Sequence, residues 1–371
     1  MKDFPLFRST RSGLVGLAIM VLPLLVFSLS PISMPFALML TVMVLPAAAC
    51  IAGLVCGSLP MAAGAMGGIL SMYLIAGPKG AQVAAVYLIP IIIAFVVVVI
   101  RRVPFWKGCA AMIGVHVAAL AGGYLMIQGF AGGQLFTLAG DWAADYLTRA
   151  EESDQILYVF YQYGLITLPE DMKETMLIPA AEGGYMMSAA ARADLILSMR
   201  SLVNSLLVTL VPSLLISQSI LGGVACLALP LKYGAVAAQR RDFKQVIDDQ
   251  KELQAPDFPD LAMPPVSLWH IPRGIGWKVG VCWLLGNFLQ AASSVPLAMA
   301  GIILYAGSSA LFTIQGICMI NFLQKAKGSR KAWRIILPLL LYLVSLLSIV
   351  GIFDQLTNLR GLRKPREPKE E

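Results

Sequence analysis

The stretch VAAVYLIPIIIAFVVVVIRR, residues 83–102, decides the fold class of this chain. Its first eighteen residues carry no charge, and Arg101 and Arg102 follow them directly. An α-helix of about 20 apolar residues spans the hydrocarbon core of a bilayer. Basic residues at the end of such a run are typical of the cytoplasmic side. The stretch therefore predicts a transmembrane helix that ends in the cytoplasm.

The composition of the whole chain extends this interpretation. Of its 371 residues, 58% are apolar and 13% are charged, whereas soluble domains contain about 45–50% apolar and about 25% charged residues. These values exclude an ordinary soluble protein and a disordered one. The net charge of +7 comes from short basic clusters beside apolar runs, which indicates membrane topology rather than nucleic-acid binding. The expected solvent is the lipid bilayer.

Further apolar runs predict an all-α, polytopic transmembrane helix bundle. No charged residue occurs between Arg11 and Lys79, which leaves room for three helices. The expected spans are residues 13–30, 35–57, 60–77, 83–100, 108–130, 201–231 with a kink at Pro212, two spans within 279–323, and 335–353. This gives nine crossings, or eight if the last segment is re-entrant. We expect a multi-pass membrane protein with a cytoplasmic N-terminus.

Charge divides the chain into three regions. Residues 1–130 form the N-terminal membrane helices. Residues 131–200 hold ten acidic and four basic residues, which predicts a short extracytoplasmic segment; apolar steps of three and four in 135–147 and 171–199 predict that it is helical. Residues 201–371 form the C-terminal membrane helices, with a cytoplasmic loop at 232–278 and a basic tail.

The predicted spans contain no charged residue, which argues against an ion-coupled transporter or an intramembrane enzyme. The only histidines are His116 and His270, and the six cysteines show no metal-ligand spacing. We therefore predict no catalytic residue, no metal site and no cofactor. His116 lies among Gly114, Ala118 and Gly122, so it either packs between helices or contacts a ligand.

Uncharged amides are the main polar groups expected at membrane depth. Each needs a hydrogen-bond partner, because an unsatisfied amide in hydrocarbon costs several kcal/mol. They either tie helices together or line a cavity for an uncharged or zwitterionic solute. The candidate ligand-binding residues are Asn204, Gln218, Asn287, Gln290, Gln315, Asn321 and His116.

Four short motifs in the C-terminal half carry a family resemblance. They are VPSLL (211–215), MPPVSLWHIP (263–272), IQGI (314–317), and GIFD (351–354) followed by Leu359 and Arg360. In this order they resemble the YybS-type family of predicted bacterial membrane proteins, which is distantly similar to the substrate-binding S components of energy-coupling-factor transporters. The residues that carry the resemblance are Pro212, Pro265, Trp269, Pro272, Gln315, Gly316 and Asp354.

Two functions follow as hypotheses. The resemblance implies a small-molecule ligand bound in an S-component-like helix bundle, with no catalysis by the chain itself. The alternative is a membrane scaffold or assembly partner that recruits other membrane proteins through the acidic segment and the loop at residues 264–272. Both hypotheses stay open at the level of sequence.

Overall fold

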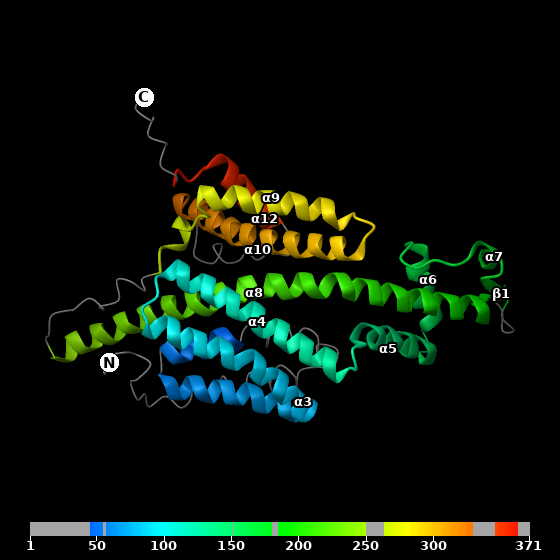
Figure 1. The fold of residues 1–371 in the computed structure, drawn as a ribbon, viewed down its shortest axis with the longest axis horizontal. Helices are drawn as coiled ribbons and strands as arrows, with labels where there is room; N and C mark the ends of the chain where they lie inside the picture. Colours follow the sequence, from blue (N-terminus) through cyan, green and yellow to red (C-terminus); the bar gives the residue numbers. More distant parts are fainter. Residues whose placement is uncertain are drawn as a thin grey trace. The chain divides into compact units, whose positions relative to one another are not determined.

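The computed structural model describes residues 45–54, 57–150, 152–179, 185–249, 263–328 and 346–362. These residues are mostly helical (Figure 1). The chain divides into two compact units. The large unit comprises Met1–Tyr124 and Ser213–Glu371, and the small unit comprises Leu125–Pro212.

Four described helices are long and apolar enough to cross a membrane: Ala76–Ile100, Phe105–Phe130, Ala189–Lys232 and Pro296–Ala326. Three shorter apolar helices accompany them, Leu45–Leu54, Ser58–Leu74 and Leu346–Thr357. The predicted first span at 13–30, most of the second, and the start of the last lie outside the described residues. The chain is therefore a multi-pass helical protein, and the total of eight or nine spans stays a prediction.

Helix α3 (Ser58–Ile100) contains the break that the sequence predicts between residues 77 and 83. Gly77 has φ 67° and ψ −161°, a backbone conformation that favours glycine. No atom outside its immediate neighbours lies within 4 Å of the position that a Cβ would take. Glycine is required there by the turn of the chain and not by close packing.

The core of the large unit forms where α3 meets α4 (Phe105–Phe130) and the second part of α8 (Ala189–Asp249). Large, fully buried side chains come from all three helices: Leu88, Ile91 and Phe95 from α3, Met112 from α4, and Leu227 from α8. The sequence predicts one helix at 201–231, kinked at Pro212, with the cytoplasmic loop beginning at residue 232. The structure has a helix through Pro212, as predicted, and α8 continues without a break past residue 231 to Asp249.

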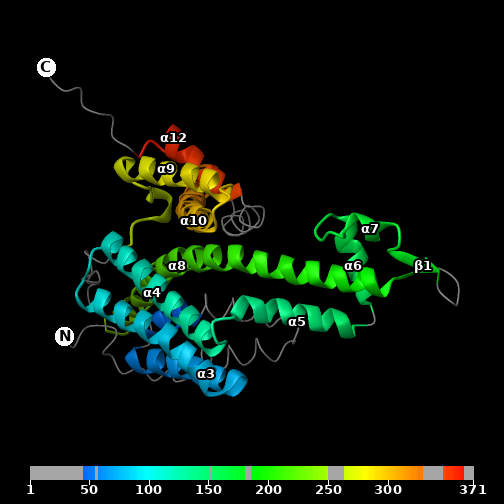
Figure 2. The same cartoon turned by 45° about the vertical axis from the view of Figure 1, so that its right-hand side comes forward.

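The C-terminal helix group consists of α9 (Arg273–Gln290), α10 (Val295–Ala326) and α12 (Leu346–Thr357), with the short helix η4 (Val266–Leu268) before it. These helices lie side by side in Figures 1 and 2. At Gly301 of α10, a Cβ would lie 2.6 Å from the backbone nitrogen of Gln290 in α9. The two helices therefore form a tight hairpin. The last helix was predicted to end at residue 353, but α12 continues to Thr357 and includes Asp354.

The small unit has its own core and its own helices, α5 (Leu135–Arg149), α6 (Ser153–Gln162) and α7 (Glu170–Lys173). Helix α5 confirms the helical pattern at 135–147 and lies alongside the start of α8 in Figures 1 and 2. The helical pattern at 171–199 is confirmed from Ala189 onward, where α8 begins, and is wrong at residues 177–179 and 185–187. Strands β1 (Leu177–Pro179) and β2 (Tyr185–Met187) pair there as an antiparallel hairpin, since Pro179 and the glycines at 183 and 184 disfavour a helix.

Candidate functional site

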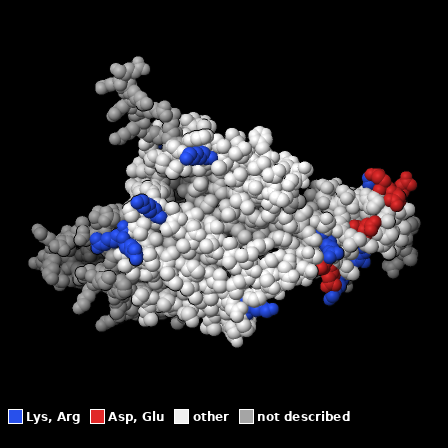
Figure 3. All heavy atoms as spheres, viewed as in Figure 1, with Lys and Arg blue, Asp and Glu red and all other residues white. Residues whose placement is uncertain are grey.

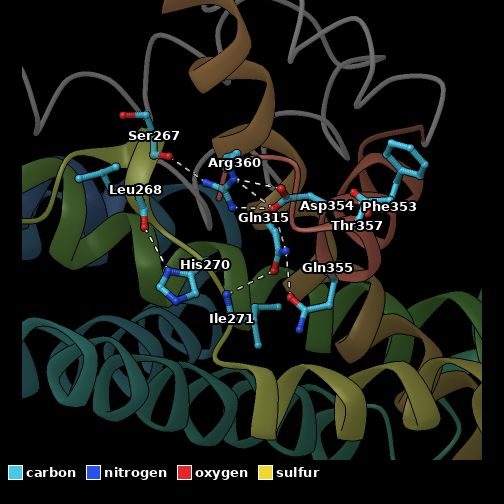
Figure 4. Close-up of polar contacts among 10 residues, drawn as sticks. All are labelled: Ser267, Leu268, His270, Ile271, Gln315, Phe353, Asp354, Gln355, Thr357 and Arg360. Atoms are coloured by element: carbon cyan, nitrogen blue, oxygen red, sulfur yellow. Dashed lines mark hydrogen bonds and ion pairs between the residues drawn. The ribbon is translucent and has the colours of Figure 1, made fainter. Parts of the chain in front are cut away.

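A buried polar network joins three of the sequence motifs at one end of the C-terminal helix group (Figure 4). The amide nitrogen of Gln315, on α10, donates to Asp354 Oδ2 at 2.9 Å and to Gln355 Oε1 at 3.0 Å, both on α12. The amide oxygen of Gln315 accepts from the backbone nitrogen of Ile271 at 3.3 Å. Gln315 therefore links α10, α12 and the loop that precedes α9.

Asp354 and Arg360 form an ion pair inside this network. Arg360 Nη2 lies 2.6 Å from Asp354 Oδ2, and Arg360 Nε donates to the same carboxylate at 3.1 Å. The two side chains are only 1% and 4% exposed, for Arg360 and Asp354 respectively. A buried charge is costly unless it is paired and hydrogen-bonded. Here the Arg360 guanidinium and the Asp354 carboxylate pair with each other.

Arg360 also fixes the loop between α8 and α9. Its Nη1 donates to the backbone oxygen of Ser267 at 2.9 Å. Two residues later, Trp269 donates from its indole to the Pro264 oxygen at 2.7 Å. The ring of Trp269 packs at 5.0 Å from Phe105, at the start of α4. The motif residues Pro265, Trp269 and Pro272 therefore belong to a loop, residues 264–272, that hydrogen bonds and ring packing fix in place. We call it the held loop.

Glycines let the helices of this site approach closely. A Cβ on Gly316 would overlap the backbone oxygen of Leu347, and one on Gly351 would overlap that of Phe312. The two glycines thus place the backbones of α10 and α12 in direct contact. Gly276 of α9 leaves the space that the Gln355 amide occupies. Gly316, singled out in the sequence, is a packing residue.

A second polar centre lies between α4 and α8 in the large unit. His116 is 1% exposed and bonds through Nδ1 to the Met112 oxygen at 3.0 Å. Its Nε2 faces Cys226 Sγ at 3.6 Å. A Cβ on Gly222 would lie 3.3 Å from the same nitrogen. The absence of a side chain at Gly222 of α8 therefore leaves room for the imidazole.

Gln218 lies on the same face of α8 as Gly222, one turn earlier. It is only 9% exposed, and its Oε1 has no hydrogen-bond partner. Such an atom is rare in a folded protein. The centre therefore contains an acceptor that is ready to receive a hydrogen bond.

The other candidate amides are not gathered at either centre. Asn204 belongs to the small unit, where its side chain packs over Gly140 of α5. Asn287 is exposed on α9 and donates to the Trp283 oxygen of its own helix at 2.8 Å. Gln290 is also exposed, and Asn321 is partly buried. Pro212 lies within α8 at the end of the small unit.

Sequence reasoning placed Arg360 after the GIFD motif, at the start of the basic tail, and missed its pairing with Asp354. The available signal was an isolated acid, Asp354, directly after an apolar run, with an arginine six residues later. Among the described residues, no group of three or more His, Cys, Asp or Glu could hold a metal ion.

The helices and their composition define a multi-pass membrane protein. Residues 251–355 match a family described as "Predicted membrane protein (DUF2232)". The match covers the motif loop, Gln315 and Asp354, and it ends five residues before Arg360. No curated protein and no solved structure matches the chain.

Proposed function

We propose that the chain binds a small uncharged or zwitterionic solute in the helix bundle of its large unit and performs no catalysis itself. The resemblance to the YybS-type family, and through it to S components of energy-coupling-factor transporters, supports this proposal. In such an arrangement partner subunits supply the energy, so the binding protein needs no charged coupling residue.

One observation carries the proposal: the unpartnered amide oxygen of buried Gln218. His116 donates through Nδ1 to a carbonyl, so in a neutral imidazole its Nε2 is an acceptor. The centre between α4 and α8 thus presents acceptors and no formal charge of its own. A solute with an N–H or O–H donor would complete the hydrogen bond of Gln218 Oε1, whereas His116 Nε2 already faces the Cys226 thiol at 3.6 Å.

The test is a thermal-stability screen of the purified protein against vitamins and cofactors. A ligand present at 100 times its Kd stabilises the folded state by about 2.7 kcal/mol. We expect at least one stabilising ligand, and we expect Gln218→Leu to remove its effect. Asn287→Leu is the matched control, because that amide is exposed and bonded within its own helix. Failure of every ligand far above micromolar concentration, or full stabilisation of Gln218→Leu, would contradict the proposal.

A scaffold function is the second candidate, and the held loop favours it. Bonds from Arg360 and to Gln315 fix the backbone at Ser267 and Ile271, while Leu268 between them is 47% exposed. A loop held in one conformation with an exposed apolar side chain suits protein docking. A photo-crosslinker at Leu268 should capture a discrete membrane partner. The same crosslinker at exposed Phe288 of α9 is the control, and equal labelling at both positions would argue against docking.

We further propose eight or nine spans in a bacterial inner membrane, with the N-terminus in the cytoplasm. The distribution of basic residues beside apolar runs supports the topology, and the resemblance to the YybS-type family of predicted bacterial membrane proteins supports the bacterial inner membrane. In a variant without native cysteines, Arg363→Cys should react with a membrane-impermeant thiol reagent only from the cytoplasmic side if there are eight spans. Reaction only from the outer side would establish nine.

A further inference from the structure

The small unit contains a pocket of about 550 Å³ where α5 turns into α6. It is lined by Trp142, Asp145, Tyr146, Arg149, Ala150, Glu152 and Ile156. None of these residues belongs to the polar centres of the large unit. The pocket is therefore independent of the proposed solute site.

Two aromatic rings form one wall of the pocket. Trp142 and Tyr146 stand one turn apart on α5 and stack with ring centroids 6.1 Å apart and an interplanar angle of 25°. They are 71% and 57% exposed. Stacked indole and phenol faces with this exposure offer the negative π surface that attracts cations.

The charges around the rings add to this attraction. Asp145 pairs with Arg149, whose Nη2 lies 2.8 Å from Asp145 Oδ1. Within the described residues, Glu152 has no ion-pair partner, so the lining carries one uncompensated negative charge. Figure 3 shows acidic side chains gathered over this unit, and residues 131–200 hold ten acids against four bases. The local field therefore favours cationic ligands.

Hydrogen bonds from α8 fix the ends of α5 and α6 that adjoin the pocket. Arg192 of α8 donates to the Leu147 oxygen at 3.3 Å, at the end of α5, and to Ser153 Oγ at 2.6 Å, at the start of α6. Its Nε lies 3.2 Å from Asp154 Oδ1. The aromatic wall thus lies on α5 and Glu152 lies directly before α6, and the adjoining ends of both helices are bonded to a third helix. A fixed wall binds a ligand without first having to be ordered.

We propose that this pocket binds an alkylammonium group, with the cation against the faces of Trp142 and Tyr146 and within reach of the Glu152 carboxylate. A free organic cation and the ammonium of a phospholipid headgroup share this chemistry. An aromatic surface that merely rests on lipid would not distinguish charged from neutral groups.

Choline and its neutral isostere 3,3-dimethyl-1-butanol are the probes, titrated calorimetrically into the full chain in maltoside detergent, which carries no ammonium group. We expect choline to bind at least about tenfold more tightly, because the two differ in the cationic charge. Equal affinity, or no choline binding at millimolar concentration, would overturn the proposal. This comparison needs no variant and so does not depend on how a substitution folds.

Variants then locate the site. Glu152→Gln and Trp142→Ala should each weaken choline binding about fivefold. The controls are Glu174→Gln, an exposed acid outside the pocket, and Trp277→Ala, an exposed indole of the large unit. Choline binding that both pocket variants leave unchanged would place the site elsewhere and overturn the assignment.

A repeat in nanodiscs containing phosphatidylethanolamine separates the two sources of the cation. If lipid headgroups occupy the pocket, they compete, and choline binds more weakly there than in detergent. If a free cation is the ligand, the affinity is unchanged. Either result supports an alkylammonium site and identifies what fills it.

Discussion

At the scale of single residues, the buried pair of Asp354 and Arg360 is sensitive to mutation. Each side chain is almost fully buried, and the carboxylate also accepts from Gln315. Asp354→Ala leaves a buried guanidinium without its counter-charge, which costs about 3–5 kcal/mol in known cases. We expect a loss of this size in the unfolding free energy of the purified protein, measured by denaturant titration.

The chain contains its own control for this prediction. Asp145 and Arg149 form an exposed pair with side chains 54% and 78% accessible, and such pairs contribute about 0–1 kcal/mol. Asp145→Ala should therefore change the unfolding free energy little. If both substitutions lowered the unfolding free energy by the same amount, burial of the pair of Asp354 and Arg360 would not explain its contribution to stability.

At the scale of elements, the contact between α10 and α12 depends on two glycines. Gly351→Ala would place a methyl group against the backbone oxygen of Phe312, and neither backbone can yield without moving a helix. Overpacking of this kind costs about 1–3 kcal/mol. We expect a lower melting temperature for Gly351→Ala.

Gly280 of α9 is the matched position, since no neighbouring atom lies within 4 Å of its Cβ site. Alanine there should leave the protein as stable or raise its stability by up to about 1 kcal/mol, because alanine restricts the unfolded chain. A melting temperature that falls equally in both variants would show that glycine flexibility, and not the helix contact, matters at these sites.

The elements also show what local sequence can predict. The break in α3 was predicted because the charge at Lys79 interrupts an apolar run, and α5 was predicted because apolar residues recur there at steps of three and four. The passage of one helix through Pro212 was predicted as well, but its unbroken continuation past residue 231 to Asp249 was not, since the basic residues after Leu231 mark the end of the apolar run and not the end of the helix. The partner of Asp354 was also missed. Arg360 reads as one of several tail arginines until α12 turns it back onto the carboxylate.

At the candidate centre between α4 and α8, the sequence singled out His116 as a candidate but did not indicate which residues surround it. Small residues near His116 in its own helix suggested close packing. In the structure, Gly122 packs closely against Val86 of α3, nothing lies within 4 Å of a Cβ at Gly114, and the small residue facing the imidazole is Gly222 of α8. One helix's sequence cannot specify which helix lies opposite, so contacts of this kind need the fold.

At the scale of the whole molecule, the division into two units predicts two independently opening regions. Arg192→Met removes the bonds that join α5, α6 and α8 in the small unit. Lost hydrogen bonds of this kind cost about 1–3 kcal/mol together. Amides in α5 and α6 should then exchange about tenfold faster or more, as measured by hydrogen exchange and mass spectrometry in nanodiscs.

The reciprocal substitution tests the separation of the units. Arg360→Met releases the loop and α12 in the large unit, so exchange should rise at residues 263–272 and in α12 while α5 and α6 keep their protection. Because each unit has its own buried core, neither substitution should spread to the other unit. Faster exchange throughout the chain in either variant would instead identify a single cooperative structure, in which the continuous helix α8 couples the two units.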